Sequence, residues 1–531
     1  MFVRQHLKNI ASVSLTTVLS RITGLIRDVV FFATIGANAF SSAFIIGFTI
    51  PNLFRRLFGE GALSSAFIPV FSSLSEKFSM ASALNFFRNF ILRWSLYLTL
   101  IALLTTALLQ LGALMGYIPD RWILPVKIFQ SLMPYMVFIC MAAIVSGALN
   151  VFGRFLSASF APVLFNCVFI AALLLGVYFS EGESGILLWL CGAVLVGGLV
   201  QLLLPAYDLY RQSRGLVLGS EQMISKAESI GRTFSPDDEQ AAFKSFWSLF
   251  IPSLLGAALL QINILVSRLL AHSLDDTSVS FLYVSSRLME LPLGIFTLAI
   301  VTVFFPEMSR AFVDQSRSVF SEIAHRGMHC IVLIVLPATL GLCLLSREIL
   351  MVLFQWGQFN VSNVQATAPI VVIYALALPF HSIATFCVRC FYSAKSMTVP
   401  VRISLVLLLL NTILSLIFMS IWGVYGLALA NLIAAILHAQ LLLSATTKAF
   451  SISLVRGLKP ILKPMLFGMA AIAIICILGK FFLAYCNLSE KLSAMWAIVT
   501  LIPLSACSYF FVLHRLGIAN QQIWELLRQQ K

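Results

Sequence analysis

The sequence predicts an all-α integral membrane protein with two parallel six-helix lobes and a C-terminal helix pair. Three observations lead to this fold class: the composition, a series of apolar segments of spanning length, and a repeated pattern of prolines. Of the 531 residues, 60% are hydrophobic and 11% are charged, whereas an ordinary soluble domain is about 25% charged. Since a soluble protein needs a charged surface, most of this surface must face lipid.

The apolar segments predict about 14 transmembrane helices. A spanning helix needs about 20 predominantly apolar residues, and no strand-like alternation competes with the helical reading. The segments are centred on residues 10–35, 38–57, 92–116, 128–149, 159–179, 186–206, 247–270, 279–305, 329–346, 367–388, 401–420, 422–445, 462–484 and 493–513.

The basic residues of the connections predict that both termini lie in the cytoplasm. Cytoplasmic loops of membrane proteins accumulate Lys and Arg, which also explains most of the net charge of +14 without any nucleic-acid partner. With the N-terminus inside, most connecting Lys and Arg residues fall on the cytoplasmic side. The opposite side then holds only Arg121, Lys127, Arg347, Lys480 and Lys491.

The domain organisation follows from one hydrophilic stretch and an internal repeat. We expect an N-terminal lobe at 1–210, a cytoplasmic linker at 211–245, a C-terminal lobe at 246–450, and a helix pair with a cytoplasmic tail at 451–531. Parallel repeats of this kind place the substrate between the halves and alternate access around it. The prolines that recur in order across the linker are Pro51 with Pro292, Pro69 with Pro306, and Pro134 with Pro379.

Several ionisable residues fall inside apolar segments, where an Arg costs at least ~2.5–3.5 kcal/mol on insertion scales. Such side chains normally face a protein interior or a water-filled cavity. Adjacent residues do not face each other on a helix, so we expect no pairing between Arg27 and Asp28. Arg287 and Glu290 are three residues apart and can pair on one face. The full set is Arg21, Arg27, Asp28, Arg268, Arg287, Glu290 and Arg389.

A second group of charges lies at the end of the predicted second span. Arg55 and Arg56 are followed by Glu60 between two glycines, which permit close approach of backbones. These residues form either a basic anchor at the membrane surface or a cytoplasmic gate. A cavity with several arginines and few carboxylates suits an anion, because guanidinium groups bind phosphate oxygens in a bidentate manner. The pattern therefore suggests a phosphate-bearing substrate.

These segments resemble the MurJ (MviN) family of lipid II flippases, within the multidrug/oligosaccharidyl-lipid/polysaccharide exporter superfamily. The resemblance covers essentially the whole chain and is most specific in the first seventy residues. The matching segments are Ser20–Asp28, Ile50–Ala62, Ala161–Asn166, Ser286–Pro292 and Phe354–Phe359.

The resemblance implies a bacterial inner-membrane flippase for cell-wall biogenesis and cell shape, with no enzymatic activity. The implied substrate is an undecaprenyl-pyrophosphate-linked disaccharide-peptide, and the cell-wall synthesis machinery is a further implied partner. It also implies a groove for the lipid tail at 462–513. The implied substrate-binding residues are Arg21, Arg27, Asp28, Asn52, Arg55, Arg287 and Glu290, and the implied gate residues are Arg56 and Glu60.

Three departures from the family pattern concern the coupling of transport. Family members often carry acidic residues where this chain has Ser42 and Ser286. Some also have an acidic residue one turn after an Asn of the eleventh helix, where Asn411 is here followed by Ser415. We expect no metal site and no cofactor, and coupling either to the membrane potential or to a monovalent cation stays open.

Other functions are less consistent with these residues. A drug antiporter that exports cations would need buried carboxylates, and a membrane-embedded transferase would need a carboxylate cluster for a metal or a general base. A scaffold for the cell-wall machinery would have no use for charges inside apolar spans. A flippase for another polyprenyl-pyrophosphate-linked glycan fits the same pattern.

Overall fold

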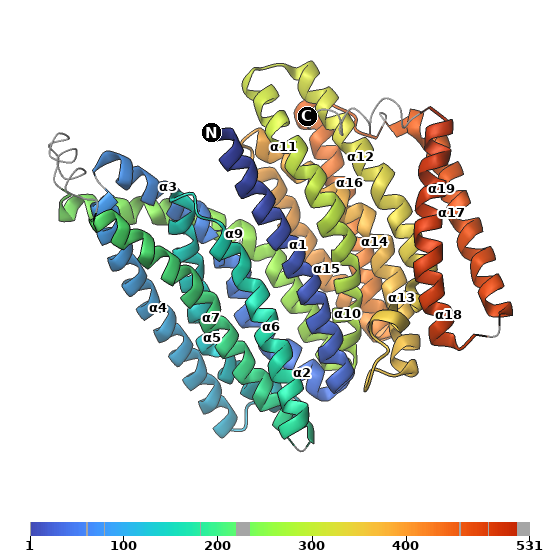
Figure 1. Ribbon diagram of the computed structural model, residues 1–531, viewed down its shortest axis with the longest axis horizontal. Coiled ribbons are helices and arrows are strands. Elements are labelled where there is room, and N and C mark those ends of the chain that lie inside the picture. Colours follow the sequence, from blue (N-terminus) through green and yellow to red (C-terminus); the bar gives the residue numbers. More distant parts are fainter. Residues whose placement is uncertain are drawn as a thin grey trace. The chain divides into compact units, whose positions relative to one another are not determined.

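The prediction of an all-helical chain is confirmed. The computed structural model describes residues 2–59, 62–78, 80–180, 182–218, 234–455, 458–486 and 488–517, and within these ranges the regular elements are all helices (Figure 1). The chain divides into two compact units, residues 1–265 and 266–531, which are taken in turn below. Residues 219–233 of the predicted linker, and Glu60 of the predicted gate, lie outside the described ranges.

The first unit contains long helices joined by short turns. The helix α9 begins in this unit and ends in the second one. The elements are α1 (Phe2–Ile35), α2 (Ala39–Phe54), the π-helical turn η1 (Arg55–Gly59), α3 (Ala62–Lys77), α4 (Met80–Leu114), α5 (Asp120–Val151), α6 (Leu156–Phe179), α7 (Gly182–Leu218) and α9 (Pro236–Leu274).

The second unit has a similar construction and ends with a helical hairpin. Its elements are α10 (Ser278–Pro292), the π-helical turn η2 (Leu293–Thr297), α11 (Leu298–Val313), α12 (Arg317–Leu344), α13 (Ser346–Leu353), α14 (Val361–Ser393), α15 (Thr398–Trp422), α16 (Val424–Phe450), α17 (Lys459–Tyr485), α18 (Glu490–Trp496), η4 (Ala497–Leu501) and α19 (Ile502–Arg515).

Eleven helical stretches in the described part of the chain are long and apolar enough to cross a membrane. The predicted segments 10–35, 38–57 and 247–270 are helical but are not among them. The first of these segments contains three charged residues, Arg21, Arg27 and Asp28, which lower its hydropathy. The helix in the second segment, α2, is only 16 residues long. The chain is thus a multi-pass membrane protein, while the count of 14 spans stays a prediction.

The first unit is built around α5, which packs against α2, α4 and α7 (Figure 1). The contact between α2 and α5 is close because position 47 is glycine. A Cβ at Gly47 would lie 2.7 Å from Ile128 Cγ2 and 3.0 Å from the backbone nitrogen of Phe129. The small residue therefore permits the two helices to approach each other, as is common in membranes.

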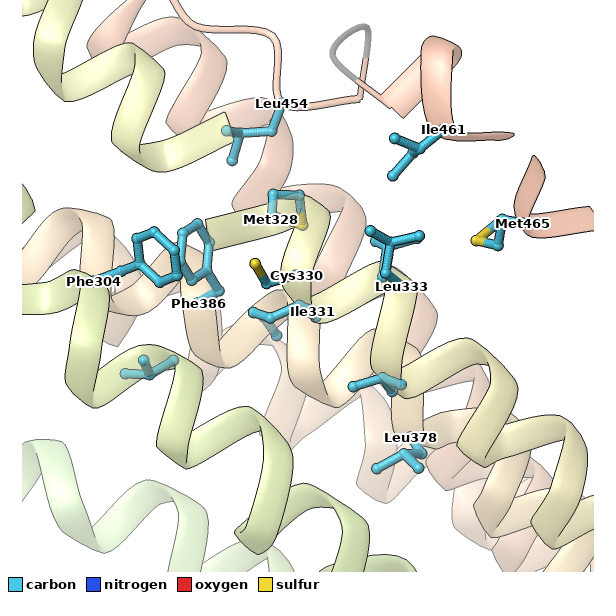
Figure 2. Close-up of a cluster of buried hydrophobic side chains, with 14 of the residues drawn as sticks. Phe304, Met328, Cys330, Ile331, Leu333, Leu378, Phe386, Leu454, Ile461 and Met465 are labelled. Carbon is cyan, nitrogen blue, oxygen red and sulfur yellow. The ribbon is translucent and has the colours of Figure 1, made fainter. Parts of the chain in front are cut away.

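The second unit has a continuous hydrophobic core that includes the C-terminal hairpin (Figure 2). Phe304 of α11 and Phe386 of α14 lie beside Gly327 of α12, where a Cβ would be 2.6 Å from the Phe386 ring. Tyr509 of α19 is buried and donates a hydrogen bond of 2.8 Å to the carbonyl oxygen of Leu333. The hairpin thus packs on α12 through both apolar contacts and a buried hydrogen bond.

The proline repeat has a structural counterpart in the two units. Pro51 lies in α2, and the π-helical turn η1 follows that helix; Pro292 ends α10, and η2 follows it directly. Proline has no N–H and its ring crowds the preceding turn, which favours a local departure from α-helical hydrogen bonding. The next helix of each unit again contains a proline, Pro69 in α3 and Pro306 in α11.

Candidate functional site

Two largely enclosed charges of the predicted site are Arg27 and Asp28 on α1. The side chain of Arg27 is 13% exposed and that of Asp28 is 7% exposed. Arg27 donates to Asp28 Oδ1 from Nη2 at 2.6 Å and from Nε at 3.0 Å. The guanidinium group also lies 5.4 Å from the ring centroid of Phe169. These contacts hold the positive charge in a fixed place next to a compensating carboxylate.

The expectation that Arg27 and Asp28 do not pair was wrong. Neighbouring Cβ atoms do diverge on a helix, but the long arginine side chain can fold back along the surface to reach an adjacent carboxylate. The driving force is burial, because an enclosed charge without a partner is far less stable than a paired one.

Asn166 of α6 completes this cluster. Its side-chain oxygen accepts a hydrogen bond of 3.2 Å from Arg27 Nη1. Its amide group lies 3.1 Å from Thr23 Oγ1 and 3.3 Å from the carbonyl oxygen of Ser20, donating to both. Asn166 is 5% exposed, so one buried amide joins the arginine and the backbone of α1 to α6.

The second predicted group lies where α2 passes into η1. Arg55 Nε donates to Asn52 Oδ1 at 2.8 Å, so the structure brings together two of the predicted substrate-binding residues. Arg55 and Arg56 are both partly buried. Arg21 of α1 is also partly buried, and it makes no ion pair with any residue that the structure describes.

The third predicted group lies on α10 in the second unit. Arg287 Nη1 donates to Glu290 at 2.9 Å, which confirms the predicted pairing on one helical face. Arg287 Nη2 donates to the Tyr283 hydroxyl at 2.9 Å. The Arg268 guanidinium lies 5.4 Å from the centroid of the same tyrosine ring. One tyrosine therefore contacts two arginines of the second unit.

The serines at the positions where the resemblance implies acidic residues are enclosed or locally bonded. Ser42 on α2 is fully buried, and Ser286 on α10 donates to the carbonyl oxygen of Tyr283 at 2.8 Å. Asn411 and Ser415 on α15 are each 2% exposed. None of these four side chains carries a charge. Among the described residues there is also no group of three or more His, Cys, Asp and Glu suited to a metal ion.

Sequence reasoning missed two residues that hold the arginines. Tyr283 precedes Arg287 by four residues, the spacing at which helical side chains meet, so this signal was available. Asn166 was noted only as part of a matching segment, and its contact with Arg27 joins residues 139 positions apart in the chain. No local spacing could have indicated that contact.

The arrangement in each unit suits the binding of an anion. The three groups contain guanidinium donors that are partly exposed, each fixed by a neighbouring oxygen or aromatic ring. Such fixed forks match the oxygens of a phosphate group. Nothing in these groups resembles a nucleophile with an adjacent base.

The sequence is similar to a known protein family and to individual members of it. The family described as "Lipid II flippase MurJ" matches residues 31–503. A "Probable lipid II flippase MurJ" of Vibrio cholerae serotype O1 is 32% identical over 456 residues, covering 83% of this chain and 82% of the relative. One of the same description from Bdellovibrio bacteriovorus is 31% identical over 512 residues, covering 94% and 93%.

Solved structures agree with the sequence relatives. The structure titled "Lipid II flippase MurJ, inward closed conformation" has a TM-score of 0.74 and 25% identity, covering 94% of this chain and 97% of that chain. An inward-facing multidrug transporter of the MATE family has a TM-score of 0.65 at 14% identity, covering 82% and 96%, and so shares the fold alone. The extent of the family match and the identity to its members show that this chain belongs to the MurJ family of lipid II flippases.

Proposed function

We propose that this protein translocates lipid II, the lipid-linked peptidoglycan precursor, from the inner to the outer leaflet of the bacterial inner membrane. Membership of the MurJ family is the observation that carries this proposal. The arginine groups support it, because the pyrophosphate of the substrate is an anion and guanidinium groups bind its oxygens. A transporter needs no nucleophile or general base, so we propose no enzymatic activity.

The proposed mechanism is alternating access between two repeats around a cationic cavity. Arg27 and Arg55 would contribute from the first unit and Arg287 from the second, with Asp28, Asn52 and Glu290 keeping their guanidinium groups in place. Arg21, which makes no ion pair within the described ranges, would bind the substrate directly. Arg56 and Glu60 would form the cytoplasmic gate, and both termini would lie in the cytoplasm.

We further propose that the membrane potential drives the cycle. Ser42, Ser286 and Ser415 leave few carboxylates to hold a sodium ion, and hard cations prefer oxygen ligands that include carboxylates. Moving one elementary charge across the membrane is worth about 2.3 kcal/mol per 100 mV. Flipping measured in cells should therefore stop when the potential is collapsed and should continue when sodium is replaced by potassium at constant potential. The reverse result would assign coupling to sodium.

Complementation tests the function itself. A bacterium depleted of its own lipid II flippase should survive with this chain and should expose lipid II on its surface. Arg27→Ala and Arg287→Ala should each abolish rescue at equal membrane levels. Arg326→Ala is the matched control, because Arg326 is half-exposed and pairs with Glu322 on a helix surface.

The other outcomes are equally informative. Rescue by the parent and by all three variants would support lipid II flipping as the function but contradict the proposed substrate-binding site. Failure of the parent, with the protein present in the membrane, would indicate another polyprenyl-pyrophosphate-linked glycan as the substrate.

A further inference from the structure

A cavity of about 540 Å³ lies in the second unit, where α11, α12, α14 and α16 end or begin. It is separate from the residues assigned to the translocated substrate. None of its described lining residues carries a carboxylate. The lining residues are Ala311, Phe312, Val313, Gln315, Arg317, Phe320, Ser393, Lys395, Ala449 and Phe450.

Two basic side chains line this cavity, Arg317 and Lys395, and each has donor groups that make no hydrogen bond to the described residues. Arg317 donates from Nε and Nη2 to the carbonyl oxygen of Phe450 at 3.1 and 3.0 Å, which fixes one edge of the guanidinium group. Its Nη1 has no hydrogen bond or ion pair to the described part of the chain. Lys395 is exposed and likewise has no such partner there. A pair of cations without a lining carboxylate is complementary to an anion.

The backbone around the cavity is unusual. Within the described ranges, the non-glycine residues with positive φ are Gln315 at 53°, Lys395 at 55° and Ser451 at 56°. Gln315 and Lys395 line the cavity, and Ser451 follows Phe450 of its lining. Non-glycine residues in this conformation are uncommon and tend to cluster at functional sites. All three residues follow the ends of helices at this cavity, α11, α14 and α16, and the chain reversals there bring Arg317 and Lys395 to its lining.

Apolar surface lies directly beside these cations. Phe312 is 42% exposed and Val313 is 69% exposed, at the end of a helix that is among the candidate membrane spans. An exposed apolar surface next to basic side chains at a span end is the arrangement of a membrane-interface site for lipid.

We propose that this cavity binds an anionic phospholipid as a resident ligand. Its phosphate would interact with Arg317 and Lys395, and the start of an acyl chain would lie along Phe312 and Val313. With the proposed orientation, this lipid belongs to the cytoplasmic leaflet. The site is distinct from the one proposed for lipid II, so it does not depend on which lipid-linked glycan is moved.

The first unit supplies an internal control. A cavity of about 380 Å³ at the ends of α3 and α9 is lined by Lys77 but also by Asp238. The carboxylate offsets the cation, so an anionic headgroup gains little there. A second control is Lys448, which is exposed on the last turn of α16 and does not line the larger cavity.

Native mass spectrometry of the purified full-length protein can measure phosphatidylglycerol binding. Lys395→Gln should weaken it about fivefold, the effect of one basic residue at a membrane surface, whereas Lys77→Gln and Lys448→Gln should leave it unchanged. Arg317→Gln should weaken it as well. Arg317 also donates hydrogen bonds to the last residue of α16, so Arg317→Gln is compared with the parent only if the two unfold at the same temperature. Lys395→Gln removes no side-chain hydrogen bond or ion pair with the described residues.

Three results would overturn the proposal. The first is equal phosphatidylglycerol binding by the parent and Lys395→Gln. The second is equal binding of phosphatidylcholine and phosphatidylglycerol, since headgroup charge would then be irrelevant. The third is displacement of the lipid by millimolar inorganic phosphate, which would indicate a site for a soluble anion.

Discussion

At the scale of single residues, the candidate site shows how charge is kept inside an apolar protein. Arg27 is held by a carboxylate, an amide and an aromatic ring, and Arg287 by a carboxylate and a tyrosine. Each partner occupies one part of a guanidinium group. These partners fix the position of each guanidinium group, and the two carboxylates also compensate its positive charge.

Loss of the Asp28 carboxylate should destabilise the protein. In Asp28→Ala, Arg27 loses the carboxylate that accepts two of its hydrogen bonds, so an enclosed charge loses this counterion. Breaking a buried pair from one side costs about 3–5 kcal/mol, and thermal unfolding in detergent should show a clear decrease. Glu290→Ala is the comparison, because that carboxylate is 38% exposed and its loss should have a smaller effect. Equal losses in both variants would contradict this account.

Asp275 should make stability depend on pH. Burial raises the pKa of this carboxyl, but hydrogen bonds from Ser278 and Thr277 lower it more, so the net pKa is below its ordinary value. A folded pKa below the unfolded one contributes stability above the unfolded value, and this contribution is lost as pH falls through the folded value. Asp275→Ala should therefore cost about 1 kcal/mol near pH 7. The difference from the parent should shrink below about pH 4, and a difference independent of pH would contradict the assignment.

At the scale of elements, close helix contacts depend on single glycines. Gly47→Ala should destabilise the protein, because the added methyl group meets both the Ile128 side chain and the backbone of α5. Gly192→Ala on α7 is the matched control: a Cβ there has nothing within 4 Å, and alanine is favoured over glycine in a helix by up to about 1 kcal/mol. Thermal unfolding of the two variants should thus shift in opposite directions. A shift of both variants in the same direction would show that the close contact at Gly47 does not determine the effect of the substitution on stability.

Helices were the easiest elements to predict, and their interruptions the hardest. Each of the 14 apolar segments falls in helical structure, because length and hydropathy are local properties of the chain. The π-helical turns η1 and η2 were not expected, although the prolines near them were noted as a repeat. A proline indicates a local disturbance but not whether it becomes a kink or a widened turn, since neighbouring helices decide between them.

At the scale of the whole molecule, composition was sufficient for the fold class, and the matching segments were sufficient for the family. Contacts between distant residues were not accessible in the same way. Asn166 and Arg27 meet across 139 positions, and only the packing of α6 on α1 brings them together. The pairing of Arg27 with Asp28 was missed because a rule about Cβ directions was applied to a long, flexible side chain.

The orientation of the chain can be tested with a natural cysteine. Cys486 is exposed at the end of α17, and the proposed orientation places it on the periplasmic side of the inner membrane. A membrane-impermeant maleimide should therefore label the parent in intact cells, and Cys486→Ser should remove most of that signal. The exposed Cys167 and Cys507 lie within candidate membrane spans, where lipid is expected to exclude the water-soluble reagent. Labelling of Cys486 only after permeabilisation would reverse the orientation and place the Arg317–Lys395 cavity in the outer leaflet.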